Sequence, residues 1–232
     1  MKKKRTALAV LGITAGILLA GCSQQVKDAE WKANENSVYV TRDGQVQSAL
    51  VYSSEQFNEL YKEEGLKAFA ENAVAEYNAG PDQADGATEV KIGDAAEGAE
   101  EEKPPVTLMS CKLENQTGYL VFDYASPEDY LEFAKFSGDN TNTITGLTVA
   151  ASDDAAAAGM LSGVGLMKPN GKEADIQDVL KSADYTIVSV EGAGTVCTEG
   201  KIAFVSAGET AVSLKDDFTA VTGEGTHYII FK

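Results

Sequence analysis

The 232-residue chain has few of the residues that build most catalytic and metal sites: one histidine, three cysteines and one tryptophan. A zinc site with several histidine ligands is therefore excluded, and Cys111 and Cys197 do not have the spacing of a zinc-binding pair. No G-x-S-x-G turn accompanies His227, so a serine hydrolase triad has no support in the sequence. No calcium-loop spacing occurs either. We expect neither a metal nor a cofactor.

Basic residues are also scarce, with 19 Lys and Arg against 36 Asp and Glu and a formal net charge of −17. Such a surface repels phosphate backbones, so nucleic acid is not an expected partner. Long apolar runs are missing as well. The longest, from Ala7 to Ala20, is shorter than the roughly 20 apolar residues that a membrane-spanning helix needs.

The N-terminal residues form a leader. A basic start, Lys2 to Arg5, precedes the apolar run, as is typical of a secretory signal peptide. The sequence Leu19-Ala20-Gly21-Cys22 that follows resembles the lipobox of bacterial lipoproteins. The resemblance implies that residues 1–21 are removed and that Cys22 becomes a lipid-modified N-terminus. The protein is then expected at the extracytoplasmic face of the cell membrane.

Removal of the leader makes the chain more acidic. Four basic residues are lost and no acidic ones, which leaves 15 against 36 and a formal charge of −21. The lipid on Cys22, and not a basic patch, would therefore hold the protein to the membrane. Residues 22–36 are polar and are interpreted as a tether that spans roughly 20 Å as a flexible coil. The sequence leaves open whether Trp31 packs on the folded part or lies near the membrane surface.

We predict an α+β fold with two β-hairpin–helix units followed by a C-terminal antiparallel β subdomain. The first hairpin covers Ser37 to Tyr52, and Asp43-Gly44 predicts a two-residue turn that places Val46 on the face opposite Val38 and Val40. A helix is expected after an N-cap at Ser53, with an interruption at Gly65 and an end at Gly80.

The second hairpin begins at Thr107, and its expected loop is Asn115–Gly118. One face is apolar and should pack on the core: Met109, Cys111, Leu113, Leu120, Phe122 and Tyr124. A helix is predicted from Ser126-Pro127 to Gly138. Cys111 is expected to be a buried, unreactive thiol. A disulfide between Cys111 and Cys197 stays open, because export would permit it.

We divide the chain into a hairpin–helix domain, 37–150, with an acidic loop at 81–105, and a region of short helices and antiparallel strands, 151–232. Six short β-rich runs after Tyr185 support the second part. The element order, with the segments "SVYVTRDGQV" and "YIIFK", resembles uncharacterised lipoproteins of Gram-positive anaerobes. That resemblance implies no particular activity.

The expected function is a non-enzymatic interaction or envelope-associated module whose partner is an envelope protein. A small-ligand (solute) binding lipoprotein is the alternative, and a hydrolase ranks third. The best candidate surface is the polar face of the second hairpin, where Tyr119 would be the anchor beside Lys112 and Asp123. An exposed tyrosine supplies a large contact area and loses little rotamer entropy on binding.

Overall fold

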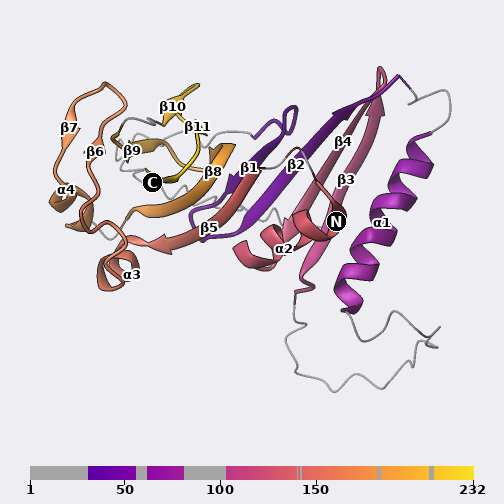
Figure 1. Cartoon of the computed structure of the whole chain (residues 1–232), viewed down its shortest axis with the longest axis horizontal. Coiled ribbons are helices and arrows are strands. Elements are labelled where there is room, and N and C mark those ends of the chain that lie inside the picture. The colour runs from indigo at the N-terminus through magenta and orange to yellow at the C-terminus, as the bar shows by residue number, and fades with distance from the viewer. Residues whose placement is uncertain are drawn as a thin grey trace, which may run out of the picture.

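The computed structural model describes residues 31–55, 62–80, 103–139, 141, 143–181, 184–208 and 212–232. In this part of the chain it is a mixed α+β fold with four helices and a twelve-stranded open sheet, mostly antiparallel (Figure 1). The predicted α+β class is confirmed. The signal peptide, Cys22 and nearly all of the acidic loop lie outside the described residues.

The elements alternate between hairpins and helices in the first half and are mainly strands in the second. The helices are α1 (Glu63–Ala79), α2 (Pro127–Ser137), α3 (Ser152–Ala157) and α4 (Ile176–Leu180). The first strands are β1 (Ser37–Val40), β2 (Val46–Ser53), β3 (Val106–Glu114), β4 (Thr117–Tyr124), β5 (Thr143–Ala151), β6 (Leu166–Met167) and β7 (Glu173–Ala174). The last are β8 (Thr186–Thr198), β9 (Ile202–Ser206), β10 (Ser213–Leu214), β11 (Thr219–Thr222) and β12 (Thr226–Phe231).

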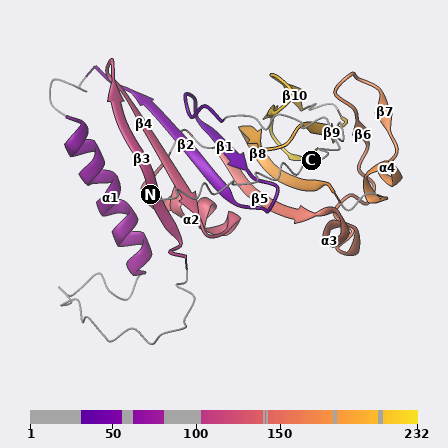
Figure 2. The ribbon, with the colours of Figure 1, turned by 180° about the vertical axis from the view of Figure 1, so that it is seen from behind.

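One sheet connects the whole described chain, in the order β3-β4-β2-β1-β8-β12-β9-β6-β7. β5 and β11 also pair with β8, and β10 pairs with β11. Only the β1–β8 pair is parallel among the described strand pairs. α1 lies beside β3 at one end of the molecule, while α3 and α4 lie with β6 and β7 at the other (Figures 1 and 2).

The first hairpin has a longer loop than predicted. Gly44 is at φ 84°, its N–H donates to the carbonyl of Thr41, and the N–H of Thr41 donates to the carbonyl of Gln45. These bonds define a three-residue loop with a glycine bulge, and not a two-residue turn. The extra residue shifts the register by one, so Val46 pairs with Val40. Val46 therefore shares a buried face with Val40 and not with Tyr39, because side chains alternate along a strand.

The second hairpin has a shorter loop than predicted. Asn115 and Gln116 both have positive φ, at 48° and 63°, and Glu114 pairs directly with Thr117. This two-residue turn leaves the predicted apolar face in place for Cys111, Leu120 and Phe122, because the change in loop length is even. The register is interrupted between Leu108 and Ser110, so Met109 lies at a bulge and is 56% exposed. Its predicted core position is wrong.

The helices differ in how well the sequence defines their ends. The Ser126 side chain accepts a hydrogen bond from the Asp129 N–H, and Gly138 ends α2 in the left-handed conformation, both as predicted. The predicted cap at Ser53 and the predicted interruption at Gly65 are both wrong. Ser53 is still in β2, where its hydroxyl is 2.8 Å from that of Thr117, and Gly65 lies inside the first turn of α1. Residues 56–61 lie outside the described part.

β8 bends at its middle and joins the two halves of the sheet. Its residues up to Ala193 pair with β5 or β12, and those from Gly194 onward pair with β1 or β11. The glycines between the apolar runs of this stretch favour two shorter strands, but the structure has one strand of 13 residues. One sheet face packs on α1 and α2 around Phe122, Tyr124 and Phe133. The opposite face of the C-terminal part carries a second core under α3 and α4.

Candidate functional site

The predicted binding residues do share one face of the sheet. Lys112 pairs with Tyr119. Asp123 lies four residues after Tyr119 on β4 and therefore points to the same face. This open face is opposite the one that carries Leu120, Phe122 and Tyr124, where α1 and α2 pack. Tyr119 is half-buried, because β3 and β2 flank it on both sides.

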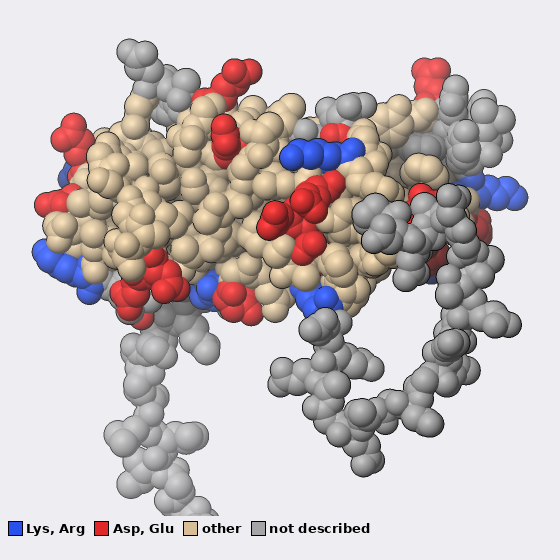
Figure 3. Space-filling model, turned by 60° about the horizontal axis from the view of Figure 1, so that its bottom comes forward, with Lys and Arg blue, Asp and Glu red and all other residues tan. Residues whose placement is uncertain are grey.

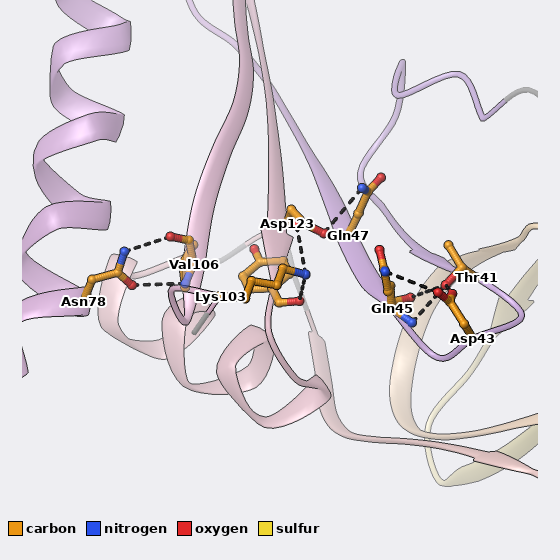
Figure 4. A network of polar contacts seen from close by, with 9 residues as sticks. Thr41, Asp43, Gln45, Gln47, Asn78, Lys103, Val106 and Asp123 are labelled. Atoms are coloured by element: carbon orange, nitrogen blue, oxygen red, sulfur yellow. Dashed lines mark hydrogen bonds and ion pairs between the residues drawn. The ribbon is translucent and has the colours of Figure 1, made fainter. Parts of the chain in front are cut away.

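The two charged residues of this face already have partners within the chain. Lys112 Nζ lies 2.7 Å from Glu114 Oε1, and this hydrogen bond raises the pKa of Lys112. Asp123 lies 2.9 Å from Lys103 Nζ, and its carboxylate also accepts a bond from Gln47 (Figure 4). The Asp123 side chain is only 14% exposed. Of the three predicted binding residues, the two charged ones are therefore already paired within the chain, and Tyr119 is the one that remains.

An apolar groove on the helix side of the sheet was not found from the sequence. Leu50 of β2 and Leu120 of β4 form its floor, and Leu66 and Phe69 of α1 form one wall. A cavity of about 440 Å³ lies here, and its lining also includes Tyr52. We call this cavity the α1 groove. It continues into a smaller cavity of about 80 Å³ toward α2, which shares Leu50, Phe69 and Leu120.

The α1 groove exposes large apolar side chains. Phe69 is 71% exposed and Tyr52 is 56% exposed. Leu66, Phe69 and Ala70 lie at helical spacing along α1, but of the three only Ala70 is buried. α1 packs mainly along β3. The face of α1 that carries Phe69 therefore lies over β2 and β4 without packing closely on them. Clustered apolar exposure of this kind marks binding surfaces in soluble domains.

Polar side chains fix α1 against the edge strand of the sheet. The Asn78 amide donates to the Val106 carbonyl at 2.8 Å, and its oxygen accepts from the Val106 N–H at 3.0 Å (Figure 4). At the other end of the helix, Glu63 accepts from the Leu113 N–H at 3.0 Å. The free edge of β3 is thus partly covered, which protects it from pairing with another strand. These contacts also set one wall of the α1 groove.

Aromatic rings surround the smaller cavity toward α2, whose lining includes Phe122 and Phe133. Phe133 lies 5.2 Å from Phe122 and 5.4 Å from Tyr77, measured between ring centroids. Burial raises the pKa of Tyr77 to about 12, and the nearby carboxylates of Asp129 and Glu132 add to this shift. The Tyr77 hydroxyl donates to the Glu132 carboxylate at 3.3 Å, which ties the end of α1 to α2.

The two described thiols are free and lie far apart. Cys111 is on β3 and Cys197 on β8, with β4, β2 and β1 between them. Four strand spacings of about 4.8 Å each separate their backbones by roughly 19 Å, well beyond the roughly 7 Å that a disulfide can span. The Cys111–Cys197 bridge that the sequence left open is therefore not formed. Burial raises the pKa of both thiols. Cys111 is only half-buried, so its predicted full burial is wrong.

His227 is a core residue. It is 2% exposed, pairs with Val190 of β8, and places Nε2 3.2 Å from the Glu224 carbonyl. No group of three or more His, Cys, Asp or Glu side chains that could hold a metal ion occurs among the described residues. None of the four described helices is long and apolar enough to cross a membrane.

Charged side chains are spread over the surface. On the face in Figure 3, the lysine and arginine side chains stand apart from one another among acidic ones. Ion pairs such as Lys201–Asp217 at 2.7 Å and Lys168–Asp178 at 4.0 Å are consistent with this pattern.

Comparison with known proteins found no match to any family model, to any curated protein or to any solved structure.

Proposed function

We propose that this protein is a lipid-anchored, extracytoplasmic interaction module without enzymatic activity. The anchor rests on the leader and the lipobox-like Leu19 to Cys22, which resemble those of bacterial lipoproteins. Binding rests on one observation, the α1 groove, where an apolar floor and an exposed Phe69 are available to a partner. An envelope protein that inserts apolar side chains is the expected partner.

The anchor is tested by fractionating cells that express Cys22→Ala. We expect the variant to leave the membrane fraction, because without the sulfur no lipid can be attached. Cys111→Ala is the matched control, since it removes another cysteine and leaves the leader intact. A Cys22→Ala protein that sediments with membranes like the wild type would contradict the anchor.

The groove is tested by photo-crosslinking in the protein's own host. A photoreactive amino acid at position 69 is expected to give a discrete adduct with one envelope protein. The same group at position 109 serves as control, because Met109 is also large, apolar and 56% exposed but lies at the β3 bulge. Equal adducts from both positions, or none from position 69, would contradict the groove as the interaction site.

The open face around Tyr119 is the second candidate surface for the same function. Its support is the shared face of Tyr119, Lys112 and Asp123, although the two charged residues are paired within the chain. A photoreactive group at position 119 separates it from the α1 groove. Adducts from 119 and not from 69 would move the interaction site to the open face.

A small-ligand (solute) binding lipoprotein is the alternative function. The observation in its favour is the volume of the α1 groove, about 440 Å³, which lies within the roughly 300–1,000 Å³ range of small-molecule sites. Thermal unfolding in the presence of apolar compounds tests it, because a ligand that binds only the folded state raises the melting temperature. Phe69→Ser should abolish that shift.

We also propose the finer organisation into a hairpin–helix domain, 37–150, and a C-terminal part, 151–232. The order β1-β2-α1 followed by β3-β4-α2 supports two similar units in the first part. The pairing of β8 with β1 and β5 connects both parts through one strand. Urea unfolding followed by two probes, one in each part, tests this organisation, since separate transitions are expected only from separate domains.

A further inference from the structure

The segment before β1 is part of the folded domain. The Trp31 ring stacks on Tyr39, with centroids 5.0 Å apart and planes inclined by 6°. Its indole N–H donates to the Ser37 hydroxyl at 3.4 Å. Asn36 accepts from the Val51 N–H at 2.6 Å. Of the two alternatives for Trp31, the structure therefore selects packing on the domain, and residues 31–36 do not act as free tether.

A cavity of about 370 Å³ lies between this segment and the open face of the sheet. Strands β1, β8 and β11 form the sheet side of this cavity. The loop before β11, with Asp216 and Phe218, forms another side. We call it the Trp31 cavity. It is separate from the α1 groove, because Tyr39, Cys197 and Thr219 have registers on the open face and Leu50 and Leu120 lie on the other.

The lining of the Trp31 cavity combines aromatic rings with hydrogen-bonding groups. Trp31, Tyr39 and Phe218 are all half-buried, so each ring keeps part of its surface accessible. Asn34, Glu35 and Asp216 supply an amide and two carboxylates, and Lys32 supplies an ammonium group. This combination suits a ligand whose ring has apolar C–H faces and hydroxyl groups at its edge, because the faces stack on aromatics and the hydroxyls donate to carboxylates.

The charges of the lining narrow the ligand class further. Glu35 is paired with Lys215 Nζ at 2.5 Å, and Asp216 accepts the Phe218 N–H at 2.7 Å. Their negative charge is therefore partly compensated, which reduces the attraction for a cation. The lining also includes Lys32, so its carboxylates and ammonium groups nearly balance, and a neutral ligand fits better than an anion on a protein whose full chain has a net charge of −17. A wholly apolar ligand would displace water from these polar groups without forming hydrogen bonds to them, which costs free energy.

We propose that the Trp31 cavity binds a neutral saccharide of one or two sugar rings. Its volume is within the range of small-molecule sites, about 300–1,000 Å³. The proposal is independent of the partner of the α1 groove, since the two cavities lie on opposite faces of the sheet. It goes beyond the proposed function, because it assigns a ligand class and a second site.

Intrinsic fluorescence can follow binding in this cavity, because Trp31 is the one tryptophan of the chain. The full-length protein in detergent is titrated with maltose, cellobiose and di-N-acetylchitobiose while Trp31 emission is followed. We expect a saturable change in intensity or wavelength with at least one of the three. The absence of a saturable change with all three overturns the proposal. So does saturation by tetramethylammonium or palmitate in their place.

Matched variants locate the binding. Phe218→Leu keeps apolar volume and removes a ring, and it should weaken saccharide binding about tenfold, as expected for the loss of one stacking contact. Phe136→Leu changes another half-exposed phenylalanine, outside the cavity, and should leave the affinity unchanged. Phe69→Ser should leave it unchanged as well, although it damages the α1 groove. Equal affinity in wild type and Phe218→Leu would overturn the site.

Discussion

At the residue scale, single polar side chains satisfy the backbone groups that the sheet leaves open. Asn78 is the clearest example, because its amide bonds both the N–H and the carbonyl of Val106 as a neighbouring strand would. Val106 is 1% exposed, so water cannot replace those bonds easily. The carbonyl of Glu224 similarly provides a partner for the buried His227 ring.

Asn78→Ala is expected to lower the free energy of unfolding by about 1–3 kcal/mol, because it leaves two buried backbone groups without partners. Urea unfolding of the purified protein measures this change. Asn72→Ala on the exposed side of α1 is the matched control and should change stability by less than about 0.5 kcal/mol. Similar effects of the two substitutions would mean that the Val106 bonds contribute little.

The thiols of Cys111 and Cys197 should react slowly in the folded protein. Burial raises the pKa of both, so at pH 8 less thiolate is present than in the unfolded chain. Their raised pKa contributes stability below the unfolded thiol pKa, and this contribution is lost as pH rises through the folded value.

Alkylation with iodoacetamide, followed residue by residue by mass spectrometry without reductant, measures the thiol reactivity. We expect slow labelling at both cysteines that speeds up on addition of urea. Cysteines that stay unlabelled in urea would indicate a disulfide, against the separation of β3 and β8. Fast labelling of Cys111 in the folded protein would contradict its protection.

At the element scale, turns and caps set where strands and helices begin. The Ser126 cap and Gly138 fix both ends of α2 within the local sequence. The turn of the second hairpin has a less suitable residue, because Gln116 adopts a left-handed conformation at φ 63°. A residue with a Cβ in that conformation costs roughly 1–2 kcal/mol relative to an ordinary helical or extended one.

Gln116→Gly should therefore stabilise the protein by about 0.5–1 kcal/mol, since glycine adopts this conformation without strain and the Asn-Gly pair is the preferred two-residue turn. Thermal or urea unfolding measures the gain. Gln116→Ala keeps the Cβ and should give no stabilisation. A stabilising alanine, or a destabilising glycine, would show that the strain of the turn is not what limits this hairpin.

At the scale of the whole molecule, β8 connects the parts of the sheet and Gly192 permits its bend. Gly192 has φ 98°, and a Cβ built on it would lie 2.2 Å from the Thr143 carbonyl oxygen of β5. The two backbones approach closely at the point where β8 stops pairing with β5 and begins to pair with β11. The bend therefore depends on the absence of a side chain.

Gly192→Ala is expected to destabilise the protein by about 4 kcal/mol or more, because both the conformation and the contact with Thr143 are violated. Gly163→Ala is the matched control. Gly163 also has positive φ, at 76°, but nothing lies within 4 Å of its Cβ position, so a cost of about 1–2 kcal/mol is expected. Soluble yield and melting temperature compare the two. Equal losses would refute a steric role for Thr143.

The sequence by itself determined the local features of this protein. Alternation placed Leu120, Phe122 and Tyr124 on one face and Tyr119 with Asp123 on the other, because side-chain direction along a strand has a period of two. The capping residues of α2 predicted both of its ends. These predictions depend on local geometry alone, which the residues of each segment fix by themselves.

The tertiary structure decided what depends on residues far apart in the chain. Glycines at 192 and 194 suggested two strands, yet pairing with four neighbours keeps β8 continuous. Phe69 stays exposed because α1 is held at the β3 edge by Asn78 and Glu63, a contact that helical periodicity does not encode. Trp31 stacks on Tyr39 because the parallel β1–β8 pair creates the surface that receives it. Both cavities arise from such long-range packing, so the sequence alone could not locate them.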